Sequence, residues 1–200
     1  YFNIGDITSA SKLCQKSYDI SQTSGNSRVT GYCELLTGKL LKVKGSIKEA
    51  FSKYDIAIGL FTKHKLAKEV ILSTLLKIEL LTIIGNLVQA KVYLDSIRDK
   101  ITLPDLKAKL LIEEIKLLIE SIPLEKREIE KKLEDIKKNP TLKEDWEIIL
   151  GYHGARFLYY HKLRNREVAK QEINLLKDKM GKLTKGLREQ HKSQNYNSSE

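Results

Sequence analysis

Residue types that catalyse reactions or bind metals are few and scattered in this 200-residue chain. The two cysteines, Cys14 and Cys33, belong to no CxxC pair and have no histidine at ligand spacing. Neither a zinc site nor a disulfide framework is therefore predicted. No GxSxG turn is present for a nucleophile, and residues 181–184, GKLT, lack the upstream glycine of a phosphate-binding loop. We expect a protein that is not an enzyme and that has no cofactor and no metal site.

One stretch has the residue types of a binding surface instead. His153 and His161 are eight positions apart, near one face of a predicted helix, with Arg156 and Lys162 beside them. Tyrosines at 152, 159 and 160 add aromatic area, and tyrosine with arginine is the pairing enriched at interaction hot spots. The stretch is either a solvated or partly buried polar face, or one wall of a groove.

The C-terminal region is basic and contributes much of the formal net charge of +10. Positive charge on a helix attracts phosphate backbones without sequence specificity, and it also attracts acidic protein surfaces. Aromatic residues that could stack on bases are almost absent there, Tyr196 being the exception. An acidic protein partner is therefore favoured, with nucleic acid as the alternative. The basic residues are Arg164, Arg166, Lys170, Lys177, Lys179, Lys182, Lys185, Arg188 and Lys192.

Composition predicts an all-helical protein. Leucine, isoleucine, lysine and glutamate dominate, and only three prolines are present. The most apolar stretch, residues 70–88, contains Lys77 and Glu79, so it falls short of the ~18 to 20 apolar residues that span a bilayer. We therefore expect no membrane partner. The two isolated cysteines favour a reducing, intracellular location, cytoplasmic or nuclear.

The elements that position these residues follow a repeat with a period of 40. A glycine, a polar residue, an aliphatic residue and an alanine recur in register in residues 5–10, 45–50 and 85–90. Such self-similarity is typical of stacked helical repeats. Apolar spacing predicts helices over 8–21, 28–44, 47–61, 66–84, 87–97, 106–121, 124–138 and 142–163, and a last one with a packing face from 169 to 180. They form units at about 1–21, 28–62, 66–101, 105–139 and 142–181, followed by a polar, frayed tail at 191–200.

Local signals mark several boundaries. Gly45 is expected to end a helix, because glycine accepts the left-handed cap conformation. Thr141, with Glu144 three residues later, has the pattern of a capping box that starts the next helix. In residues 164–166, Asn165 is the residue expected to take the left-handed turn conformation in place of glycine.

The spacing within a unit resembles that of the tetratricopeptide repeat. Gly38, Leu41, Ala50, Tyr54 and Ala57 follow that family's pattern of small residues at a close helix crossing with large residues beside them. The period is 40 rather than 34, as in the long-helix variant found in scaffold and regulatory proteins. The resemblance implies a right-handed α-solenoid of about five helical hairpins with a concave groove. It covers residues 1–190, and it is stronger up to Lys100 than after it.

The resemblance also implies which residues face the groove, since the first helix of each unit lines that surface in the family. The partner-binding residues carried over are Tyr32, Leu35, Lys39, Lys42 and Val43 in one unit and Leu72, Leu75, Glu79, Thr82 and Ile83 in the next. Arg156, His161 and Lys162 join them as candidates from the stretch described above, where they would form one wall of the groove. Leu35 and Lys39 do not reproduce the lysine and asparagine pattern of the chaperone-binding subgroup. We expect a peptide or helix with acidic and apolar residues to fill the groove.

The function implied is a protein–protein interaction scaffold, a segment of a larger intracellular assembly such as those of the cell cycle. The alternative is a peptide-sensing regulator that resembles bacterial pheromone receptors and controls an attached DNA-binding or effector domain. The sequence opens at Tyr1 within a repeat, so we expect a piece of a longer protein.

Overall fold

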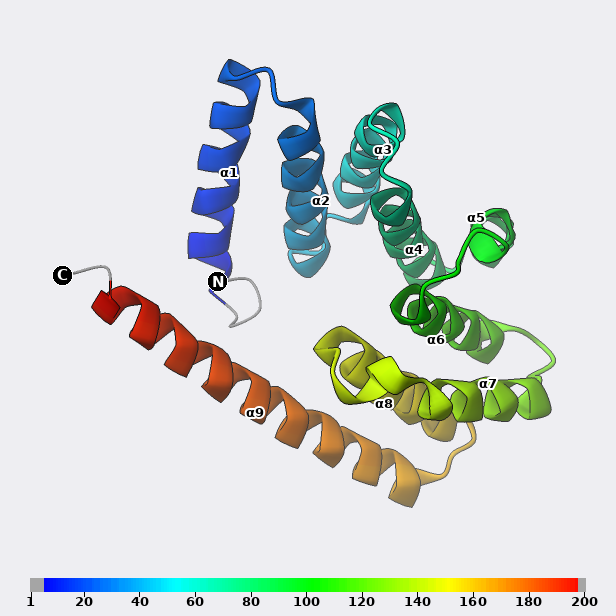
Figure 1. Ribbon diagram of the computed structural model, residues 1–200. Coiled ribbons are helices and arrows are strands. Elements are labelled where there is room, and N and C mark those ends of the chain that lie inside the picture. The colour runs from blue at the N-terminus through cyan, green and yellow to red at the C-terminus, as the bar shows by residue number, and fades with distance from the viewer. Residues whose placement is uncertain (1–5, 198–200) are drawn as a thin grey trace.

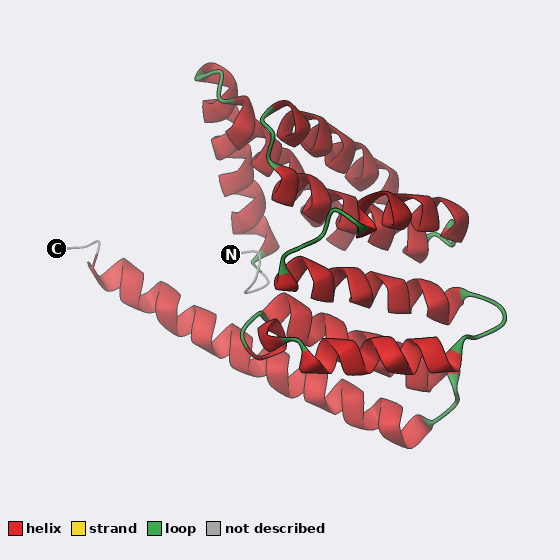
Figure 2. Cartoon of the chain, turned by 45° about the vertical axis from the view of Figure 1, so that its right-hand side comes forward, coloured by secondary structure: helices red, strands yellow, loops and turns green. Residues whose placement is uncertain are grey.

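The computed structural model describes the backbone of residues 6–197 and the side chains of residues 6–186 and 189. Within that range the regular structure is helical, and no strand occurs (Figure 2). Gly5 of the first repeat lies outside the described residues. The helices are α1 Ile7–Thr23, α2 Ser27–Val43, α3 Ile47–Lys63, α4 Ala67–Ile83, α5 Leu87–Arg98, α6 Pro104–Glu120, α7 Lys126–Lys138, a 3-10 turn η2 Pro140–Lys143, α8 Trp146–Lys162 and α9 Arg166–Asn197.

The first four helices are each 17 residues long and start 20 residues apart, because the same turn follows each of them. At the first turn the amide of Asn26 donates to the carbonyl of Ser21 at 2.9 Å, which closes the helix end in the manner of a Schellman motif. This geometry needs a left-handed residue, and Gly25, Gly45 and Gly85 supply it with φ of 67°, 82° and 78°. The predicted role of Gly45 is confirmed.

Two predicted boundaries are wrong. At the turn before α9 the left-handed residue is Arg164, with φ 58°, and Asn165 caps the helix by accepting the amide of Val168 at 3.2 Å. Thr141 and Glu144 form no capping box. Asn139 caps the 3-10 turn there, and α8 begins at Trp146 behind Asp145, whose carboxylate accepts two amides of its first turn. An Asp directly before a helix satisfies these amides better than a threonine five residues upstream.

The helices follow one another in a C-shaped arc from α1 to α9, with α5 on its outer side (Figure 1). Each packs on its sequence neighbours, and α6 also packs on α4 and on α8. The core is accordingly divided into successive clusters: one between α1 and α2, one around Ala50, Tyr54 and Leu80, one joining α4 to α6, and one joining α6 to α8.

The C-terminal region is more regular than predicted. Helix α9 continues through Asn197, so the expected polar tail is helical as far as the backbone is described. In the described part of the chain, no helix has the length and apolar character needed to cross a membrane.

Candidate binding groove

A hollow of about 640 Å³ lies among alternate helices, α2, α4, α6 and α8. Its apolar lining is formed by leucines and one isoleucine that are buried or half-buried. Gly151 of α8 permits a close approach to α6, because a Cβ there would lie 2.9 Å from Cδ1 of Ile112. The lining residues are Leu35, Lys39, Lys42, Leu72, Leu75, Leu76, Glu79, Lys109, Ile112, Glu113, Lys116, Glu147, Leu150 and Gly151.

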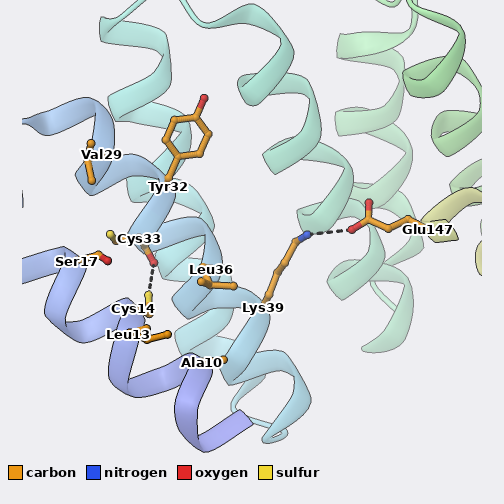
Figure 3. Close-up of a pocket in the computed structure, with 10 residues that line it drawn as sticks. All are labelled: Ala10, Leu13, Cys14, Ser17, Val29, Tyr32, Cys33, Leu36, Lys39 and Glu147. Carbon is orange, nitrogen blue, oxygen red and sulfur yellow. Dashed lines mark hydrogen bonds and ion pairs between the residues drawn. The ribbon is translucent and has the colours of Figure 1, made fainter. Parts of the chain in front are cut away.

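Two further hollows, each of about 570 Å³, adjoin the central one and share its charged residues. The first lies between α1 and α2 and has Lys39 and Glu147 in common with it (Figure 3). The second lies near the C-terminal ends of α4 and α6 and has Glu79 and Lys116 in common with it. We call the three hollows together the groove, because shared side chains make its lining continuous.

An ion-pair chain crosses the central hollow from α2 to α6. Lys42 Nζ lies 2.6 Å from Glu79 Oε2, and Lys116 Nζ lies 3.5 Å from Glu79 Oε1 and 2.7 Å from Glu113 Oε1. Burial alone would raise the pKa of Glu79, but Lys116 and Lys42 outweigh it and hold the pKa below its ordinary value. Glu79 is therefore a carboxylate fixed between two ammonium groups.

Glu113 is only partly satisfied, since Lys116 contacts one of its oxygens. Its Oε2 atom is buried and has no hydrogen-bond partner among the described residues. Burial raises the pKa of Glu113 above its ordinary value, although Lys116 opposes the shift. The groove therefore contains one carboxyl group whose charged form is destabilised.

A second group of ion pairs lies at the N-terminal end of α8. Glu147 Oε1 is 3.4 Å from Lys39 Nζ, and Glu147 Oε2 is 2.6 Å from Lys109 Nζ. Desolvation raises the pKa of Glu147, but Lys39 and Lys109 outweigh it and lower the pKa overall. Figure 3 shows Lys39 reaching from α2 toward Glu147 on α8. This pair joins residues 108 positions apart in the sequence.

Most of the predicted binding residues line the groove. Tyr32 and Lys39 line the first hollow, and Ile83 and Thr82 line the last. The central hollow brings together Leu35, Lys39, Lys42, Leu72, Leu75 and Glu79. Val43 is exposed at the end of α2 and belongs to none of the three hollows.

The C-terminal candidates lie elsewhere. Arg156 points to α9, where its Nε donates to Glu172 Oε1 at 2.7 Å, and His153 Nδ1 lies 2.8 Å from the other oxygen of Glu172. Arg156 therefore links α8 to α9. It belongs to a partly buried polar face, the alternative that the sequence analysis gave beside a groove wall. His161 is exposed beside Phe157, with ring centroids 5.7 Å apart.

Lys162 lies at the margin of the groove. Its Nζ is 3.8 Å from Oε2 of Glu120, and Glu120 lines the last hollow. Lys162 therefore lies beside the groove, whereas Arg156 contacts α9.

Sequence reasoning missed the lining residues of α6 and α8. A spacing of 37 could have found some of them, because it separates Lys42 from Glu79, Glu79 from Lys116, and Tyr32 from its partner Glu69. The 40-residue repeat describes equivalent positions, whereas 37, about one helical turn less, describes positions that touch.

No group of three or more metal-binding side chains occurs in the described part of the chain. The chain matches no family model, no curated protein and no solved structure.

Proposed function

We propose that this chain is a non-catalytic interaction module, a tetratricopeptide-like right-handed superhelix of helical pairs that binds a peptide or helix of a partner protein in the groove. The observation that carries this proposal is the position of the groove: it runs across α2, α4, α6 and α8, the first helices of the units that the repeat defines. Neighbouring units stack to bury their apolar faces, which leaves these helices to present a continuous surface.

The groove has the chemistry of a peptide site. Leu35, Leu72, Leu76 and Leu150 are only half-buried, so part of their apolar surface remains for a partner to cover. Lysines and carboxylates along the lining give such a partner orientation and register. A segment that fits would bury apolar side chains on the leucines and place polar groups near the lysines.

Display of short random-sequence peptides against the purified chain tests the proposal. Leu72→Gln, in the groove, should abolish enrichment of the peptides selected by the wild type. Val92→Gln is the matched control, because Val92 lies on α5 outside the groove and is 63% exposed. Circular dichroism melts establish that both variants remain folded. Selected peptides that bind Leu72→Gln and wild type equally would refute groove binding.

The peptide-sensing regulator is the second candidate, favoured by the Lys39–Glu147 pair. This pair connects α2 to α8 across the groove, so an occupant that separates the two side chains changes the distance between the arms of the arc. Small-angle X-ray scattering with and without a selected peptide measures this change. An unaltered radius of gyration would leave the scaffold as the better description.

A further inference from the structure

The charged side chains of the groove divide into fixed and exchangeable ones. Glu79 is 23% exposed and held between two lysines, and Glu113 is buried. Glu147, in contrast, is 63% exposed although it contacts two lysines. It is the one carboxylate of the central lining that can leave without breaking the packing beneath it.

The fold has little need of the Glu147 side chain. Lys39 and Lys109 are 28% and 20% exposed, but Glu147 itself is solvated, so its carboxylate contributes little to stability by staying in these pairs. The start of α8 is held by Asp145, whose Oδ1 accepts the amides of Glu147 and Ile148 at 2.8 and 3.2 Å. Asp145 also lies 3.7 Å from Lys109, so that lysine retains a carboxylate neighbour when Glu147 moves away.

The lysines define what could replace it. The central lining contains Lys39, Lys42, Lys109 and Lys116, and two of these, Lys39 and Lys109, converge on Glu147 from different helices. When Glu147 leaves, two ammonium groups face the groove beside half-buried leucines. An incoming carboxylate restores the ion pair that Lys39 loses and adds a second carboxylate beside Lys109, which keeps Asp145.

We propose that Glu147 occupies, within the free chain, the place of an acidic side chain of the bound partner, so that the groove selects peptides carrying Asp or Glu next to apolar residues and Glu147 competes with them. This inference rests on the proposed function and adds the partner chemistry and an internal competitor. It predicts an unusual result: loss of a charged residue in the site should strengthen binding.

Fluorescence anisotropy with peptides from the display selection tests this. Glu147→Gln should bind an acidic selected peptide about 3- to 10-fold more tightly than wild type, since the competing charge is gone. Lys39→Gln and Lys109→Gln should each weaken the same peptide by a similar factor. Glu144→Gln is the matched control, because it removes the same charge three positions away, outside the groove lining.

A second set of peptides, with Gln in place of each Asp or Glu, separates the two proposals. The gain in affinity of Glu147→Gln over wild type should disappear with these peptides. With the acidic peptides, added salt should reduce that gain. Two results would refute competition by Glu147 but not binding in the groove. The selected peptides could depend on Leu72 yet show no preference for acidic residues, or they could bind Glu147→Gln no better than Glu144→Gln. Selection of no groove-dependent peptide would overturn the proposed function, and this inference with it.

Discussion

Gly38 is the position where one added methyl group should most disturb the fold. It lies in the interior of α2, and a Cβ built there would be 2.4 Å from Cε1 and 2.6 Å from Cδ1 of Tyr54. The Tyr54 ring is fully buried and packs with Ala50 and Leu80. Because the ring is enclosed by these neighbours, we expect α2 and α3 to separate when Gly38 becomes alanine.

The expected magnitude follows from two opposing effects. Alanine in place of glycine inside a helix contributes about 0.5 to 1 kcal/mol of stability. Overpacking a tight interior costs about 1 to 3 kcal/mol. Because both contacts are far below van der Waals distance, the upper part of that range applies, and Gly38→Ala should lose about 1 to 2 kcal/mol net. In a chain of this size the melting temperature should fall by about 2 to 8 °C.

Gly59→Ala is the matched control, since nothing lies within 4 Å of a Cβ at that position in α3. It should gain about 0.5 to 1 kcal/mol by helix propensity alone, so the same chemical change has opposite signs at two sites. Urea denaturation followed by circular dichroism measures both free energies of unfolding.

Relief of the clash provides a second check. In a Tyr54→Leu background, Gly38→Ala should lose most of its cost, which a double-mutant cycle measures. If Gly38→Ala and Gly59→Ala stabilise the protein equally, the close crossing of α2 and α3 is wrong.

Three further predictions concern stability. Lys77 is buried against aromatic rings and pairs with half-exposed Asp55, so Asp55→Asn, which leaves the ammonium without its carboxylate, should cost about 1 to 3 kcal/mol in urea denaturation. Lys77→Met, which leaves a carboxylate that water can solvate, should cost less than about 1 kcal/mol. Lys65 has φ 56°, so Lys65→Gly should raise the melting temperature, whereas an alanine at Gly85, φ 78°, should lower it. The raised pKa of Glu113 means that its contribution to stability falls as pH rises above the ordinary glutamate value, so Glu113→Gln should gain stability relative to wild type as the pH rises above that value. Equal pH profiles for that variant and wild type would contradict the assignment.

Helix positions could be predicted closely because the signals are local. Gly25, Gly45 and Gly85 take the conformation that ends a helix. Asn26 and Asn86 then cap the next helices with their side chains, whereas Ser46 precedes α3 without a side-chain cap hydrogen bond. The left-handed residue before α9 was predicted wrongly for a physical reason. The hydrogen bonds that end α8 determine which position is left-handed, and that position holds Arg164, while Asn165 caps α9.

The orientation of α8 could not be predicted because this helix is buried on more than one side. Ile149 and Tyr152 are both buried, and periodicity alone does not identify which side meets α9. The deciding feature is Glu172, a buried carboxylate of α9 that needs the positive charge of Arg156. No pattern in the α8 segment alone reveals that partner, so Arg156 was assigned to the groove.

The ion pairs of Glu79 and of Glu147 in the groove differ in their exposure to water. Glu79 of α4 pairs with Lys42 of α2 and Lys116 of α6 in an enclosed position. Breaking either ion pair there would leave a charge that water solvates poorly, so Glu79 fixes the spacing of the three helices. Glu147 makes the same kind of contacts from an exposed position, where exchange of one carboxylate for another changes the free energy little. In the proposed function, a groove of fixed width with one exchangeable carboxylate selects an acidic peptide without rearranging its core, because the incoming carboxylate takes the place of Glu147 beside Lys39.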